Sequence, residues 1–229
     1  MKRSGLAAAC LWAAGAAQAA ADAEFAIRLD PAEGGPATIE AVAEALRLPE
    51  GKRKSFEVRY FSVKQPADAP PGASAIARER LSGGEMESMY KLRSPVAFPA
   101  HGPQADWRCP FKVDAKRQME VDIGWSAEGV TKTNHSLSCE ADGRIADLLP
   151  ARFMAKPLDC TSSMLRMSSR GIKIERWSLP GGRQAFEVST NGKNTGAERK
   201  AFASGVVQPL IGRGARPLQQ SKTQLGSAC

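Results

Sequence analysis

Charged residues recur at alternate positions in segment after segment of this chain, and this constrains the fold more than any other feature. In a strand, side chains i and i+2 lie on the same face, so each segment places its charges on one face and mostly apolar or small residues on the other. One such segment is typical of a solvated face, but a series predicts a sheet with one charged face. Curling that sheet would enclose the charges in a barrel. The pairs are Glu24 and Arg28, Glu57 and Arg59, Arg78 and Arg80, Lys91 and Arg93, Glu120 and Asp122, and Lys173 and Glu175.

The N-terminal residues have the layout of a secretory signal peptide. Lys2-Arg3 is a short basic region, an apolar run follows at 6–17, and Ala17-Gln18-Ala19 is a small-x-small cleavage site, with Ala21-Asp22-Ala23 as a second option. We therefore expect residues 1–19 to be removed, residues 20–229 to form a single domain, and the mature protein to be exported to the periplasm. The apolar run is too short to span a bilayer, and no later segment is long enough.

The charge of the chain favours anionic partners. Removing the signal peptide lowers the formal charge from +8 to +6, because Lys2 and Arg3 leave with it and no acidic residue does. A basic domain is suited to phosphates, nucleic acid or an anionic membrane surface. A charge of this size is also compatible with plain solubility, and the sequence contains no specific nucleic-acid-binding motif.

Four cysteines remain in the mature chain, and an even number in an exported protein predicts two disulfides. Three pairings are possible. We favour Cys109–Cys139, which would close a strand meander, together with Cys160–Cys229, which would tie down the C-terminal end. No Cys-x-x-Cys spacing is present, which argues against a cysteine metal site.

Hydrophobic periodicity and turn residues predict an α+β fold around a curled antiparallel sheet. A helix is expected between Pro36 and Pro49, a short one at 145–153, and a final one at 196–211. Neighbouring strands joined by short turns must be antiparallel. The predicted strands are 24–29, 56–63, 75–81, 86–93, 108–113, 118–125, 130–139, 171–179 and 183–190.

Standard enzyme signatures such as GxSxG, HExxH, the Walker A loop and GxGxxG are absent. His101 and His135 lack a plausible Ser or Cys partner, so a structural role is favoured for both. The charged strands remain, since Arg and Lys bind phosphate oxygens and nearby carboxylates bind Mg²⁺ or Mn²⁺. A metal that bridges phosphate oxygens, with water as nucleophile, is sufficient for phosphoanhydride hydrolysis. The alternative is a solvent-exposed sheet face whose Arg–Glu pairs contribute little to stability and carry no function.

The order of the charged motifs resembles the CYTH superfamily, also called the triphosphate tunnel metalloenzymes, over nearly the whole mature chain. The family opens with an ExExK strand, and Glu24-Phe25-Ala26-Ile27-Arg28 is similar to it. The further similar segments, in chain order, are Tyr60-Phe61-Ser62-Val63, Arg78-Glu79-Arg80, Met89-Tyr90-Lys91 followed by Arg93, Glu120-Val121-Asp122, the hairpin of 173–177 and 186–189, and Ser221-Lys222 after the last helix.

The resemblance implies an eight-stranded antiparallel β-barrel, or tunnel, with flanking helices, in which basic residues bind a triphosphate and carboxylates bind Mg²⁺ or Mn²⁺. Carried over by motif, the phosphate ligands would be Arg28, Arg78, Arg80, Lys91, Arg93 and Lys222. The metal ligands would be Glu24, Asp122 and Glu187.

Three departures from the family pattern bear on activity. Ala26 replaces the second Glu of ExExK, Arg28 replaces its Lys, and Ser189 stands where a closing-strand carboxylate is often found. We expect an exported CYTH-like protein that binds a phosphate-rich anion such as tripolyphosphate or polyphosphate, and the loss of two acids leaves open whether it also hydrolyses the anion with a divalent metal. The alternative is a non-catalytic periplasmic binding or inhibitor protein that uses the fold for a protein or envelope partner.

Overall fold

The computed structural model describes residues 20–67, 69–98 and 109–226, apart from the side chains of Asp159, Cys160 and Lys222. The predicted signal peptide at 1–19 and the predicted Cys160–Cys229 bridge lie outside the described residues. His101 lies outside them as well.

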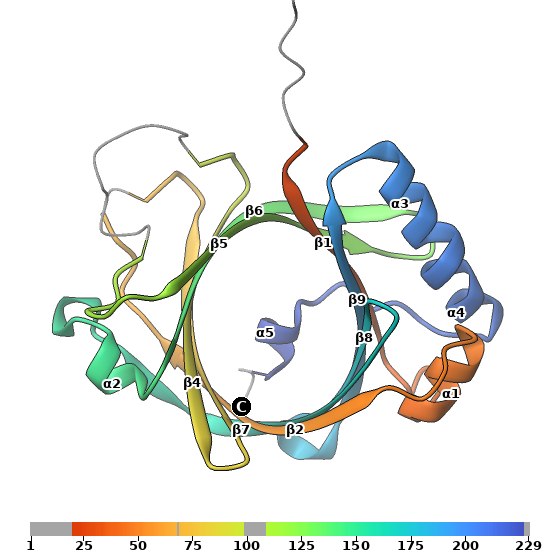
Figure 1. Cartoon of the computed structure of the whole chain (residues 1–229), viewed down its shortest axis with the longest axis horizontal. Coiled ribbons are helices and arrows are strands. Elements are labelled where there is room, and N and C mark those ends of the chain that lie inside the picture. Colours follow the sequence, from red (N-terminus) through yellow and green to blue (C-terminus); the bar gives the residue numbers. More distant parts are fainter. Residues whose placement is uncertain (1–19, 68, 99–108, 227–229) are drawn as a thin grey trace, which may run out of the picture.

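Within these ranges, nine strands close into a barrel that is viewed along its axis in Figure 1. Around the barrel the order is β1-β5-β6-β4-β3-β2-β7-β8-β9, and β9 pairs with β1 to close it. All neighbouring pairs are antiparallel except β1 and β5, which are parallel. The strands are β1 (Asp22–Leu29), β2 (Lys52–Ser62), β3 (Ser74–Ser82), β4 (Glu85–Ser94), β5 (Lys116–Trp125), β6 (Val130–Asp142), β7 (Lys156–Ser169), β8 (Ile172–Ser178) and β9 (Gln184–Lys193).

This architecture confirms a barrel with flanking helices and corrects two details. The expectation of eight antiparallel strands was wrong, because the described barrel has nine strands and one parallel pair. The turn rule predicts the direction of strands that follow each other closely, but β1 and β5 are far apart in sequence.

Two strand assignments also differ from the prediction. Strand β7 was missed because Pro157 and several serines obscure its pattern, although proline is tolerated near the start of a strand. The predicted strand at 108–113 is wrong over its described part, 109–113, which is not extended into the sheet. A disulfide holds this segment instead, since Cys109 is bonded to Cys139 of β6 as predicted.

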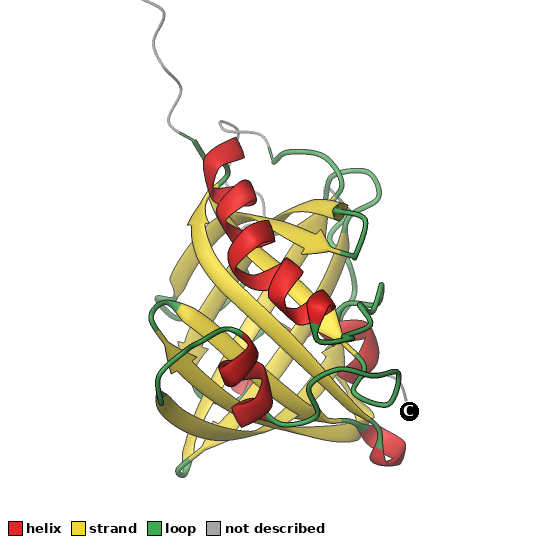
Figure 2. Cartoon of the chain, turned by 90° about the vertical axis from the view of Figure 1, so that its right-hand side faces the viewer, coloured by secondary structure: helices red, strands yellow, loops and turns green. Residues whose placement is uncertain are grey.

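Helices cover the outer face of the barrel. Apolar outward side chains of β1, β5, β8 and β9 pack against α1 (Ile39–Ala45), α3 (Gly196–Phe202) and α4 (Gln208–Gly212). A π-helical turn, Ala203–Val207, joins α3 and α4 into the long helix that crosses the strands in Figure 2. This confirms the predicted final helix.

A smaller outer core lies over β3, β4 and β6, under α2 (Ile145–Leu148) and the 3₁₀ turn Ala151–Phe153. A second 3₁₀ turn, Pro180–Gly182, joins β8 to β9. The last helix, α5 (Lys222–Gly226), appears within the outline of the barrel in Figure 1. Among the described residues, no helix combines the length and apolar character that a membrane span requires.

Candidate functional site

The polar face of the sheet lines the inside of the barrel. On β1, Phe25 and Ile27 face the outer helices, so the alternation turns Glu24 and Arg28 inward. The same alternation turns four more of the predicted charged pairs inward, on β3, β4, β5 and β8. The Glu57 and Arg59 pair is the exception, because it lines a hollow on the outer surface beside α2. Interpreting that pair as part of the charged interior was wrong.

The barrel interior contains two adjoining cavities. The first has a volume of ≈ 280 Å³, and its lining includes Arg78, Arg80 and Lys91. The second has a volume of ≈ 360 Å³, and its lining includes Arg28 and Asp122. Glu24, Arg93 and Thr223 line both and separate them. The first cavity is strongly charged, whereas the second has many hydroxyl and amide groups.

Two neighbouring arginines on β3 dominate the first cavity. Arg78 is 5% exposed and Arg80 is 9% exposed, and neither Nε has a hydrogen-bond acceptor among the described residues. One terminal nitrogen of Arg78 donates to the Met89 sulfur at 3.2 Å, and sulfur is a weak acceptor. The closest carboxylate oxygen of Glu87 lies 3.7 Å from Arg80. Two buried guanidinium groups with unsatisfied donors form a site that attracts an anion.

The electrostatics of Arg80 point in the same direction. Burial, reinforced by the positive charges of Arg78 and Arg166, lowers its pKa from 12.5 to about 10, against the weaker opposing effect of Glu175. The guanidinium carbons of Arg80 and Arg166 lie 5.6 and 5.1 Å from the centre of the Phe56 ring. The ring offsets part of the desolvation cost, but it cannot accept the Arg80 protons as an anion would.

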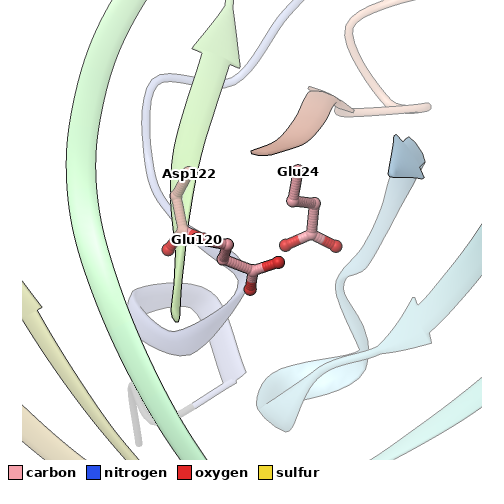
Figure 3. A group of neighbouring side chains, drawn as sticks. All are labelled: Glu24, Glu120 and Asp122. Carbon is pink, nitrogen blue, oxygen red and sulfur yellow. The ribbon is translucent and has the colours of Figure 1, made fainter. Parts of the chain in front are cut away.

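A carboxylate group lies at the junction of the two cavities. Glu24 of β1 and Glu120 and Asp122 of β5 each offer an oxygen within 4.8 Å of the others. Figure 3 shows these three side chains as neighbours inside the barrel. The parallel pairing places Glu24 directly opposite Asp122, and Glu120 lies two residues away on the same face. Oxygen donors at this spacing suit Mg²⁺ or Mn²⁺.

Two cations contact this carboxylate group. The Lys91 ammonium lies 3.3 Å from Glu120 Oε1 and 3.1 Å from Asp122 Oδ1, and Arg93 Nε lies 3.0 Å from Asp122 Oδ2. Burial opposes ionisation of Asp122, but Lys91 and Arg93 outweigh it and lower its pKa from 3.8 to about 2. Burial dominates at Glu120 and raises its pKa despite the attraction of Lys91.

Glu187 lies apart from these three carboxylates. Its Oε2 is 2.7 Å from Arg28 Nε, and the two residues face each other across β1 and β9. Burial alone would lower the pKa of Arg28, but Glu187 and Glu24 outweigh it and raise that pKa. Ala26 of β1 lies opposite Ser189 of β9. The two positions at which the resemblance led us to expect an acid, and at which this chain has none, are therefore neighbours.

Helix α5 brings the C-terminal part of the chain into the barrel. Leu225 packs with inward apolar side chains of β2, β7, β8 and β9, including Tyr60 and Trp177. The Gly226 carbonyl accepts a hydrogen bond from Ser162 Oγ at 3.2 Å, and Thr223 Oγ1 lies 3.3 Å from Arg93. One part of the interior is therefore filled with apolar side chains, while the charged part keeps its cavities.

The structure thus brings together most of the residues that the family motifs predicted. Arg78, Arg80, Lys91 and Arg93 share one cavity with Glu24, and Asp122 lies at its edge. Arg28 faces the second cavity, and the Lys222 side chain is outside the described set. The assignment of metal ligands missed Glu120, although the charge alternation on its strand had indicated that it faces inward.

Comparison with known proteins identifies no matching family model and no matching curated protein. Similar solved structures include the PH1012 protein from Pyrococcus horikoshii (11% identity, TM-score 0.48, covering 88% of this chain and 98% of that one). A proposed adenylate cyclase from Vibrio parahaemolyticus has 10% identity and a TM-score of 0.48, covering 92% of this chain and 100% of that one. The proposed adenylyl cyclase HpAC1 from Hippeastrum, described as having a dominant triphosphatase activity, has 11% identity and a TM-score of 0.46, covering 88% of this chain and 92% of that one.

Proposed function

We propose that the barrel interior binds a linear, phosphate-rich anion such as tripolyphosphate or polyphosphate, in a protein exported to the periplasm. The observation that carries this proposal is the pair of buried guanidinium groups, Arg78 and Arg80, whose Nε donors lack acceptors among the described residues. A phosphate oxygen between them would satisfy both donors and reduce the repulsion between the two cations. Lys91 lines the same cavity and would contact a second phosphate.

The site also contains the parts needed for a metal-assisted reaction, and hydrolysis of the bound anion is the second candidate function. Glu24, Glu120 and Asp122 would hold Mg²⁺ or Mn²⁺, because their oxygens are close together and are of the type that these ions prefer. A bound metal would polarise a phosphate oxygen and supply an activated water. The arginines would orient the chain of phosphates and stabilise charge on its oxygens.

Binding and hydrolysis are tested separately. Thermal shift and calorimetry with tripolyphosphate in EDTA would measure binding, since a ligand held by the native state raises its apparent stability. The informative variant is Arg78→Met, and the matched control is Arg59→Met, whose arginine lines the outer hollow instead. Binding that is lost in the first variant and kept in the second supports an anion site in the barrel.

Phosphate release with Mn²⁺ would then be measured on the wild type and on Glu24→Ala. Metal-dependent release that Glu24→Ala abolishes supports the enzyme. Binding without release leaves a non-catalytic anion binder. Absence of both would refute this function and favour a protein or envelope partner for the fold.

A further inference from the structure

The Lys91 side chain lies against the carboxylate group and uses ligand atoms that a metal would need. Its ammonium is 3.1 Å from one oxygen of Asp122 and 3.3 Å from one oxygen of Glu120. Lys91 is 6% exposed, so water screens these contacts little. We propose that Lys91 is a built-in counter-cation of the carboxylate group: a divalent metal must displace it, and an anion that draws Lys91 away makes room for the metal.

The hydrogen bonds of the two β5 carboxylates support this reading. Asp122 Oδ1 accepts from Lys91 and from Ser136 Oγ, the latter at 3.0 Å, while its Oδ2 accepts from Arg93. Glu120 Oε1 accepts from Lys91, and its Oε2 accepts from Gln118 at 2.9 Å. All four oxygens therefore already have donors, and Asp122 Oδ1 has two, so a metal ion would share these oxygens with the bound cations and would compete with Lys91 most directly at Asp122 Oδ1.

The charge of the group leads to the same conclusion. Glu24, Glu120 and Asp122 carry three formal negative charges, and Lys91 and Arg93 return two positive ones. A divalent ion that enters beside both cations is attracted by the carboxylates and repelled by Lys91 and Arg93. At this burial, each unit charge about 4 Å from the ion changes the affinity for the metal by more than tenfold. Removing Lys91 alone should therefore strengthen metal binding.

Lys91 is also placed to respond to the anion. It projects from β4 into the cavity that Arg78 and Arg80 line, and its ammonium is a point charge on a flexible stem of four carbons. An anion at the two arginines competes with Glu120 and Asp122 for this ammonium. Because coupling between two ligands is reciprocal, anion and metal should each tighten the binding of the other. This coupling rests on the proposed function, whereas the counter-cation role does not.

The test is a calorimetric Mn²⁺ titration of the oxidised protein without any phosphate. We expect weak binding to the wild type, binding tighter by at least about tenfold in Lys91→Met, and weak binding in Lys91→Arg, which keeps the charge. Lys173→Met is the matched control, because Lys173 lines the same cavity but donates to Asn191 instead of the carboxylate group. Circular dichroism would establish that each variant is folded.

A second measurement uses the wild type alone, so that the proposal stays testable if Lys91→Met does not fold. Sulfate, a tetrahedral dianion, would be added at saturating concentration, and Mn²⁺ affinity should rise. Equal Mn²⁺ affinity in the wild type and a folded Lys91→Met would overturn the counter-cation role. Tight Mn²⁺ binding to the wild type without an anion would overturn it as well. Failure of tripolyphosphate to bind in EDTA would instead count against the proposed function, and the Mn²⁺ difference between wild type and Lys91→Met would stand.

Discussion

Replacing Arg80 by Met should stabilise the protein and at the same time abolish anion binding. The guanidinium is almost fully buried, and its pKa falls from 12.5 to about 10 because burial and nearby cations disfavour its charge. A fall of this size corresponds to a cost of about 3 kcal/mol in the free energy of unfolding, at about 1.4 kcal/mol per pKa unit. The value already includes the attraction of Glu175 and Glu87.

Met keeps most of the apolar contact of the arginine stem, and the main loss is the cation–π contact with Phe56, worth about 1 kcal/mol. The expected net gain is therefore about 2 kcal/mol, which would raise Tm by about 5 °C for a chain of this length. Urea unfolding and thermal melts would measure it, with Arg59→Met on the outer surface as the control, which should change stability by less than about 0.5 kcal/mol.

The same variant should lose the rise in Tm that tripolyphosphate gives to the wild type. A stability that falls in Arg80→Met, with the circular dichroism spectrum preserved, would refute the argument that Arg80 carries an uncompensated charge. Retained binding of tripolyphosphate would show that the anion contacts other cations. The opposite signs of the two effects distinguish a functional charge from a structural one.

Three further predictions follow from the described contacts. The folded pKa of Asp122 is about 2 and its ordinary value is 3.8, so its ionised carboxylate stabilises the folded protein above pH 3.8, and this stabilisation is lost as pH falls through about 2. Asp122→Asn should therefore lower the free energy of unfolding by about 2 kcal/mol at neutral pH and by almost nothing in strong acid. A difference in urea unfolding that does not change with pH would contradict this. Replacing Cys109 and Cys139 by Ala should lower stability by about 3–4 kcal/mol, because the bond closes a loop with a separation of 30 residues, and a loss below about 1 kcal/mol in urea unfolding would argue against this entropic account. Gly226→Val should lower Tm and increase hydrogen exchange in α5, because a Cβ at this position would lie 2.7 Å from the Tyr60 ring; an unchanged Tm would indicate that α5 packs differently.

Much of the barrel could be predicted from the sequence because strand alternation is a local property. Each segment shows its own two faces, and in most of the predicted charged pairs the charges do face inward. Strand β7 lacked that signal, since Pro157 and its serines weaken the pattern. The outward position of Glu57 and Arg59 shows the limit of the method, because alternation defines two faces but does not say which one is inside.

The sequence predicted most of the residues of the candidate site but not which of them contact each other. The family motifs suggested Glu187 as a metal ligand and passed over Glu120 beside Asp122. Only the register shows that Glu187 lies opposite Arg28, while Glu24 lies opposite Asp122. Short motifs carry no information about which distant strand lies next to them.

The sequence by itself determined that this chain would form strands with one charged face, and that curling the sheet would enclose those charges; it favoured a bond between Cys109 and Cys139 but left three pairings open. Only the tertiary structure decided which charges meet. The parallel pairing of β1 with β5 assembles the carboxylate group, β4 brings Lys91 against it, and β3 holds two arginines without acceptors among the described residues. The physical reason is that alternation depends on backbone geometry within a few residues, whereas ion pairing and desolvation depend on distances between strands that are remote in sequence.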